Sequence, residues 1–183
     1  MNILRRITDL MLNITDLEKI HATGLNLEEV KVTFNHDVKM NVAGINVEAK
    51  QGEIINVPRW IANVLESDNH VEIQDTDMIV ELKQAVVKEN VQGEFELATL
   101  EPHFYIKLKS QMKKLEQSDF DKVESMLNQL IRKRQGKIIR LADSAKLTAN
   151  LSSKLTFEER EFYNNLHNIS TNFKKQILGD KNE

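Results

Sequence analysis

The stretch KQGEIINVPRWIANVLESDNHVEI, residues 50–73, reads as a strand, a short helix and a second strand. Pro58 fits the first turn of the helix, because the N–H that proline lacks has no partner there. Trp60, Ile61, Val64 and Leu65 then share one helical face. Turn-forming residues end the helix, and the last three residues alternate as in a half-buried strand. Periodicity therefore predicts a small packed subdomain without a catalytic constellation, anchored by Pro58, Trp60, Ile61 and Leu65.

Ahead of this stretch, apolar and polar residues alternate in three short runs, 30–34, 38–42 and 45–49, with turn residues between them. Closely spaced alternation of this kind is typical of a small antiparallel sheet. We therefore expect a small β domain that contains a short helix and covers residues 28–75.

The first residues predict an amphipathic helix followed by a linker at 21–27, which together make up residues 1–27. The helix either docks on its own chain or binds a partner or a membrane surface. Charges of both signs on its polar face argue against a membrane, which favours Lys and Arg there. Its apolar stripe is Ile3, Leu4, Ile7, Leu10, Met11, Ile14 and Leu17.

The remaining residues, 76–183, predict an elongated helical bundle, so the expected fold class is α+β. Asp75 or Thr76 is expected to cap the first helix, and an irregular segment at 90–97 follows it. The apolar positions expected inside the first two helices are Ile79, Leu82, Val86, Phe104, Leu108, Met112 and Leu115.

Two longer helices are predicted next. Ser118 is expected to cap the first of them, and Thr156 forms a capping box with Glu159 at the start of the second. The stripe of the first is Phe120, Val123, Leu127, Leu130, Arg134, Ile138, Leu141 and Ala145. The second is expected to bury Tyr163, Leu166, Ile169, Phe173 and Ile177.

Composition narrows the function further. The net charge of −3 argues against a globally basic nucleic-acid binder, and the absence of cysteine removes thiol catalysis and thiolate metal sites. No apolar run approaches the roughly 18 residues that would cross a bilayer. A cytoplasmic protein without membrane contact is expected.

No enzyme signature is visible, and we expect no cofactor. The 5 histidines lack metal-binding spacing, so no metal site is predicted. Glu158 and Glu159 are adjacent and belong to a helix cap rather than to an acid/base pair. A catalytic site dispersed over distant loops remains the open alternative.

The one anomaly in charge is a basic cluster inside the long third helix: Arg132, Lys133, Arg134, Lys137 and Arg140. It is a solvated face, an ion-paired subunit contact or a contact to DNA phosphates. Arg134 differs from the others because it lies on the apolar stripe, where an unpaired charge would cost several kcal/mol. Its acid is expected from Glu116, Asp119 or Glu124, or from another subunit.

Three segments resemble the GINS family. KQGE-x3-VPRWIANVLESDNHVEI is similar to the family's small β domain, and LEPHFYIKLKSQMKKLE, residues 100–116, is similar to the opening of its helical domain. RKRQGKIIRLADSAK-x8-LTFEEREFYNNL, residues 132–166, is similar to the helices that follow. Together the resemblance covers about 30–178 in order, with the β domain first, as in one of the family's two subunit types.

The resemblance implies a non-catalytic, archaeal-type GINS subunit that assembles with sister subunits into a tetramer. That tetramer would link the MCM helicase to a RecJ-like partner at the fork, close to the nucleoid, with DNA contacted only indirectly. A DNA-binding module that uses the basic cluster is the alternative. The residues expected at the subunit interface are Phe104, Tyr105, Arg134, Lys137, Arg140, Phe162 and Tyr163.

Overall fold

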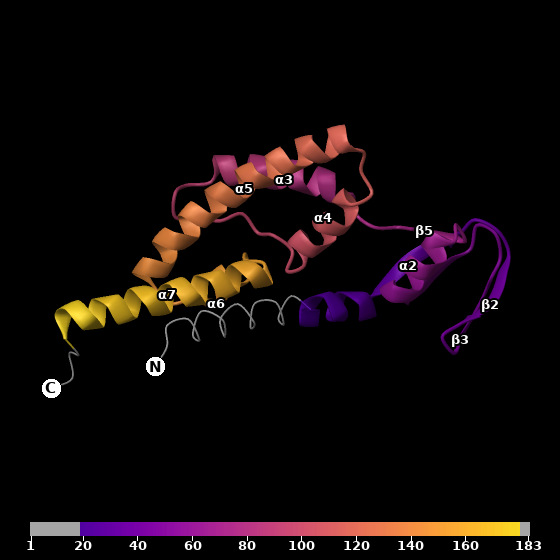
Figure 1. Cartoon of the computed structure of the whole chain (residues 1–183), viewed down its shortest axis with the longest axis horizontal. Helices are drawn as coiled ribbons and strands as arrows, with labels where there is room; N and C mark the ends of the chain where they lie inside the picture. Colours follow the sequence, from indigo (N-terminus) through magenta and orange to yellow (C-terminus); the bar gives the residue numbers. More distant parts are fainter. Residues whose placement is uncertain (1–18, 180–183) are drawn as a thin grey trace. The chain divides into compact units, whose positions relative to one another are not determined.

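The computed structural model describes residues 19–179, and these divide into two compact units with the boundary between Thr76 and Asp77. The first unit contains the strands, the helical residues 19–27 and a further short helix, and helices make up the regular structure described in the second unit (Figure 1). The predicted α+β fold, a small β domain followed by a helical bundle, is confirmed. The apolar stripe predicted at 3–17 lies outside the described residues. The linker expected at 21–27 is instead helical and buries Leu25.

The main sheet has the spatial order β4 (Ile54–Pro58), β1 (Glu29–Phe34), β5 (Val71–Ile73), and both pairings are antiparallel. A separate antiparallel pair is formed by β2 (Val38–Val42) and β3 (Ile45–Ala49). The chain thus forms two sheets where one was expected, because β4 and β5 pair with the two edges of β1 and leave no edge for β2. The β2–β3 hairpin still contributes to the same core through Val38, Val47 and Ala49.

The helix predicted after Pro58 is α2 (Arg59–Ser67), which packs against the main sheet. Pro58 is the last residue of β4 and the N-cap of α2. Ile61 and Leu65 are fully buried beneath the helix, whereas Trp60 is only partly buried against the same core. Of the predicted anchors, Ile61 and Leu65 therefore hold the centre of this core, and Trp60 lies at its edge.

The second unit is organised around one long helix. Its elements are α3 (Met78–Val91), α4 (Phe104–Met112), α5 (Gln117–Ser144), α6 (Ala149–Ser152) and α7 (Phe157–Leu178). Helix α5 contacts both α3 and α7, and α4 packs on α3 (Figure 1). Two apolar clusters result, one among α3, α4 and the first half of α5, the other among the second half of α5, α7 and neighbouring loops.

Two predicted caps are corrected. Asp77, rather than Asp75 or Thr76, caps α3, and its Oδ1 accepts a hydrogen bond from Ile79 N at 2.9 Å. Asp75 is engaged elsewhere, since it pairs with Arg59. Helix α5 has Glu116 at its N-cap instead of Ser118, without a side-chain cap. The capping box at the start of α7 is confirmed.

The predicted burial of α7 holds only for its first half. Tyr163 is buried, but Ile169, Phe173 and Ile177 are 65%, 62% and 68% exposed. Helix α5, which packs against α7, ends at Ser144. Near that end, Asp143 meets Ser170 and Lys174 of α7. Ser170 and Lys174 thus face the end of α5, whereas Ile169, Phe173 and Ile177 lie on another face of α7, which the described part of the chain leaves exposed.

Candidate functional site

Arg134 occupies a core position of α5 and is 1% exposed. Its guanidinium forms a two-point ion pair with Glu159 of α7, with Nε 2.6 Å from Oε1 and Nη2 2.7 Å from Oε2. Its Nη1 lies 2.9 Å from Oε2 of Glu89 in α3. One arginine therefore joins three helices through two carboxylates. Paired, planar geometry of this kind suits arginine better than lysine.

The remaining donor capacity of Arg134 is used by backbone carbonyls. Nη1 donates to Ala98 O at 2.7 Å, and Nη2 donates to Lys154 O at 3.1 Å. All five N–H groups of a guanidinium thus have an acceptor, which is the condition for burying its charge at acceptable cost. The same contacts fix the loops before α4 and after α6 against α5.

Lys137, one turn further along α5, is the second buried cation of this network. Its Nζ lies 2.6 Å from Oε1 of Glu89, and it donates to the backbone carbonyls of Glu89 at 3.1 Å and Glu96 at 2.9 Å. These contacts hold the irregular segment after α3. Two cations and two carboxylates balance one another, so the network carries no net formal charge into the core.

Tyr105 of α4 completes the network by donating its hydroxyl hydrogen to Oε1 of Glu159 at 2.8 Å. Burial, together with the negative charge of Glu159, raises the pKa of Tyr105 well above its usual value, so the phenol remains protonated. Burial alone would lower the pKa of Arg134, but the hydrogen bond and charge of Glu159 raise it overall. We refer to Arg134, Lys137, Glu89, Glu159 and Tyr105 as the buried network.

The acids predicted for Arg134 are wrong. Neither Glu116, Asp119 nor Glu124 reaches it, and Asp119 pairs with Lys122 instead. The true partners lie 45 and 25 residues away in sequence. In the sequence, only the capping box marks Glu159 as a special residue, and no motif marks Glu89. An arginine on an apolar stripe predicts an acid partner but does not identify it.

Burial also changes the basic cluster. Arg134 and Lys137 are inaccessible, so neither can contact DNA as the alternative interpretation required. Arg132, Lys133 and Arg140 remain on the surface, where Lys133 hydrogen-bonds to Asn90 and Arg140 pairs with Glu94 at 2.7 Å. The continuous basic surface expected from the sequence is therefore reduced to three exposed side chains.

The residues predicted at a subunit interface separate by exposure. Phe104 and Tyr163 are buried inside the bundle along with Arg134 and Lys137. The Tyr163 hydroxyl donates a hydrogen bond to Ala145 O at 2.9 Å, at the end of α5, where helix carbonyls lack partners within the helix. Burial raises the pKa of the Tyr163 hydroxyl. Tyr105 and Phe162 are partly exposed, and Arg140 is exposed. A partner can therefore reach only the last three directly.

Tyr105 and Phe162 share one surface feature, an apolar groove between α4, α5 and α7. Its volume is about 320 Å³. Glu158 lies in this groove beside the buried network, and burial raises the pKa of its carboxyl. The groove is lined by Tyr105, Lys109, Leu127, Ile131, Gln135, Ile138, Glu158, Glu159 and Phe162.

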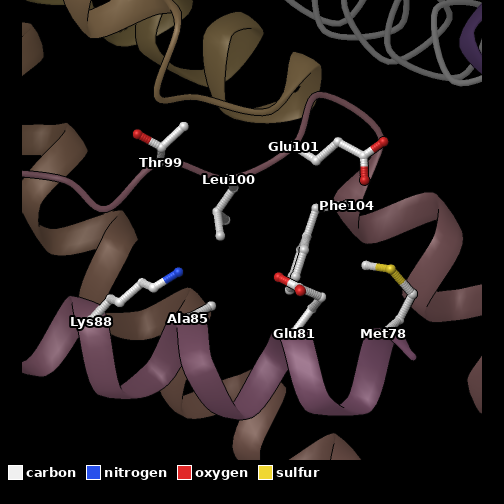
Figure 2. A pocket seen from close by; sticks show the side chains of 8 residues that line it. All are labelled: Met78, Glu81, Ala85, Lys88, Thr99, Leu100, Glu101 and Phe104. Atoms are coloured by element: carbon white, nitrogen blue, oxygen red, sulfur yellow. The ribbon is translucent and has the colours of Figure 1, made fainter. Parts of the chain in front are cut away.

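A second cavity, between α3 and the segment before α4, has a volume of about 40 Å³. Figure 2 shows Leu100 and the ring of Phe104 pointing toward α3, while the side chains of Glu81 and Lys88 extend from α3. A space of this size holds a water molecule, whereas small-molecule sites measure about 300–1,000 Å³. It is therefore a packing gap rather than a ligand site.

Two further observations concern the described part of the chain. Residues 19–179 contain no group of three His, Cys, Asp or Glu side chains arranged to hold a metal ion. No helix in this range is both long enough and apolar enough to span a bilayer. The sequence also missed one close pair in the β unit, where the rings of His36 and His70 meet.

The fold and this site define a class of protein, in which a small β domain precedes a helical bundle. A buried ionic network stabilises the bundle, and some apolar surfaces of its helices are exposed. Residues 73–178, more than half of the chain, match the family described as the GINS complex protein helical bundle domain. The chain therefore belongs to the GINS family, and it is a subunit of a DNA replication GINS complex that associates with other GINS subunits. A search of curated proteins found no match.

Proposed function

We propose that this protein is a non-catalytic scaffold subunit that joins sister GINS subunits in a tetramer. In this proposal the tetramer links the MCM helicase with a RecJ-like partner at the replication fork, and the protein acts in the cytoplasm at the nucleoid. Membership of the GINS family supports the assembly with sister subunits. The surface of α7 supports helix packing as its physical basis.

The observation that carries the proposal is the apolar stripe of α7: Ile169, Phe173 and Ile177, each more than 60% exposed. Residues four apart lie on one helical face, so the three side chains form a continuous strip. A strip of this kind in water is typical of a surface that another helix covers. The groove beside Phe162 offers a second apolar surface on the same helix.

Sedimentation velocity tests the assembly, with the full chain alone and mixed with a sister subunit from the same organism. We expect the wild-type chain to sediment as a complex and Phe173→Glu to weaken the complex at least tenfold, because a charge replaces an exposed apolar contact. Asn164→Glu is the matched control, since it adds the same charge on an exposed position of the same helix. Both variants should retain the wild-type melting temperature.

Equal assembly by wild type and Phe173→Glu would remove α7 as the contact. A monomer at micromolar concentration, both alone and with the sister subunit, would contradict the scaffold proposal itself. Capture of the MCM helicase and of a RecJ-like protein by the assembled complex, and not by the Phe173→Glu variant, tests the linking role.

The DNA-binding alternative has its own test. If Arg132, Lys133 and Arg140 contact phosphates, log K for duplex DNA should fall with log salt, and each neutralised residue should flatten the slope by about one counterion. Under the scaffold proposal, the triple alanine variant assembles normally and its weak DNA binding is unchanged.

A further inference from the structure

His36 and His70 lie more than thirty residues apart but are brought together by the main sheet. His36 follows β1, and His70 directly precedes β5. The register pairs Phe34 with Val71, and Asn35 N donates to His70 O at 2.9 Å. The backbone itself therefore fixes the spacing between the two histidines, and no mobile segment is needed to bring them into contact.

The two rings meet edge to edge at the surface. His36 Nε2 lies 2.8 Å from His70 Nδ1, with the ring centroids 5.0 Å apart and the planes inclined by 62°. His36 is exposed and His70 is partly exposed, so water and ions reach the pair. Between two neutral rings, one nitrogen donates the hydrogen and the other accepts it. The pair therefore shares a single hydrogen atom between two potential ligand nitrogens.

We propose that this histidine pair binds a divalent transition-metal ion, with Zn²⁺, Ni²⁺ and Cu²⁺ as the fitting ions. Metal–nitrogen bonds of about 2.0–2.1 Å place two adjacent imidazole ligands roughly 2.9–3.4 Å apart. The observed nitrogen separation is within a few tenths of an ångström of this range. The ion takes the place of the shared hydrogen. Each neutral ring then carries its hydrogen on the far nitrogen, Nδ1 of His36 and Nε2 of His70.

The chemistry of the neighbourhood sets the kind of site. Imidazole suits Zn²⁺, Ni²⁺ and Cu²⁺ and does not suit Mg²⁺ or Ca²⁺, which prefer oxygen. The closest acid in sequence, Asp37, uses Oδ1 to accept a hydrogen bond from Gln51 N at 2.8 Å. Two rings with water in the other positions give moderate affinity, strongest for Cu²⁺. The bound ion would fasten the turn after β1 to the start of β5.

Isothermal titration of the full chain with NiCl₂ and with ZnCl₂ tests the site. We expect one ion per chain with a micromolar Kd, and a loss of at least tenfold in affinity for His36→Asn and for His70→Asn. His21→Asn is the matched control, because it removes one histidine from the same unit and leaves the pair intact. The control should bind as the wild type does, and saturating Zn²⁺ should raise the melting temperatures of the wild type and the control but not those of His36→Asn and His70→Asn.

The site would be overturned if the double variant His36→Asn/His70→Asn bound the ion as tightly as the wild type, or if the wild type bound it with a Kd weaker than millimolar. The remaining explanation would then be a hydrogen bond that only closes the turn. If the variants fail to fold, substoichiometric Cu²⁺ on the wild type decides the matter by NMR. Line broadening must begin at His36 and His70, and broadening centred on any other histidine contradicts the proposal.

Discussion

Arg134 lies between Leu130 and Ile138 on α5, and all three side chains are almost completely buried. Its charge is tolerated there because Glu89 and Glu159 face it from two other helices. Replacing a complete buried ion pair by apolar residues is often neutral, whereas removing one partner leaves a buried charge without compensation. The protein is therefore more sensitive to the loss of Arg134 than to the loss of the whole pair.

For this reason Arg134→Met should lower the free energy of unfolding by about 3–5 kcal/mol. Arg134→Ala should cost more, because it also removes the alkyl stem and leaves a cavity. Urea denaturation followed by circular dichroism measures both. Arg132→Met, on the exposed face of α5, is the control and should stay within about 0.5 kcal/mol of wild type.

Restoring the balance of charge gives the decisive comparison. The double variant Arg134→Met/Glu159→Gln should recover part of the stability that Arg134→Met alone loses, although Glu159→Gln also weakens the capping box at the start of α7. If the double variant is less stable than the sum of both single variants predicts, the buried charge of Glu159 is not what makes Arg134→Met costly.

Glu158, in the groove, gives a pH-dependent prediction. Burial raises the pKa of its carboxyl in the folded chain, so the protonated form is favoured there and ionisation opposes folding. The cost is absent below the unfolded pKa and complete above the folded pKa. Glu158→Gln should therefore stabilise the chain at about pH 7 and change little at about pH 3.

Melting temperatures measured across this range check the sign. Glu124→Gln, on an exposed position of α5, is the control and should show no comparable gain at neutral pH. If Glu158→Gln is instead less stable than the wild type at neutral pH, the start of α7 stabilises the Glu158 carboxylate by more than burial destabilises it.

Among the elements, α2 illustrates that the sequence predicts where a helix lies but not how deeply each of its side chains is buried. Its face of Ile61 and Leu65 is fully buried, while Trp60 is only partly covered. Trp60→Ala should cost less than the 3–5 kcal/mol expected for a fully buried tryptophan, and Leu65→Ala should cost more than Trp60→Ala, within about 2–5 kcal/mol. Urea denaturation followed by tryptophan fluorescence serves for Leu65→Ala, and circular dichroism for Trp60→Ala. Equal costs for the two would place Trp60 deeper than the structure does.

Local patterns predicted most of the elements. Period-two alternation located the strands of the β unit, and turn residues located their ends. The capping box at Thr156 located the start of α7. Periodicity also marked Arg134 as exceptional. These features depend on neighbours a few residues away, which a sequence displays directly.

What the sequence could not supply depends on distance in space. Whether Phe173 is buried is decided by which face of α7 meets α5, a fact that involves another helix. The pairing of Arg134 with Glu89 and the meeting of His36 with His70 each join residues that are far apart along the chain. No periodicity or cap encodes such a contact, because it arises only when helices or strands pack.

At the scale of the whole molecule, the boundary between Thr76 and Asp77 predicts where the chain opens to proteases. Endoproteinase Asp-N should cleave before Asp75 or Asp77 earlier than Glu-C cleaves at Glu94 or Glu96. The irregular segment after α3 is held by Lys137, whose Nζ binds the Glu96 carbonyl. Mass spectrometry of a time course identifies the cuts, and a chain that resists both proteases throughout would contradict two semi-independent units.

Glu159 serves two purposes at once: it closes the capping box of α7 and it neutralises Arg134. The ends of helices ordinarily fray, and their amides exchange with solvent long before those at the centre. Here the first turn of α7 cannot unwind without stripping a buried guanidinium of its counter-ion. Hydrogen exchange along α7 should therefore run in one direction, with the amides of 160–163 protected almost as long as the global fold and those of 172–177 exchanging early. Helix α7 therefore has a stable N-terminal end and a fraying C-terminal end, and the fraying end is the one that presents Phe173 to a partner.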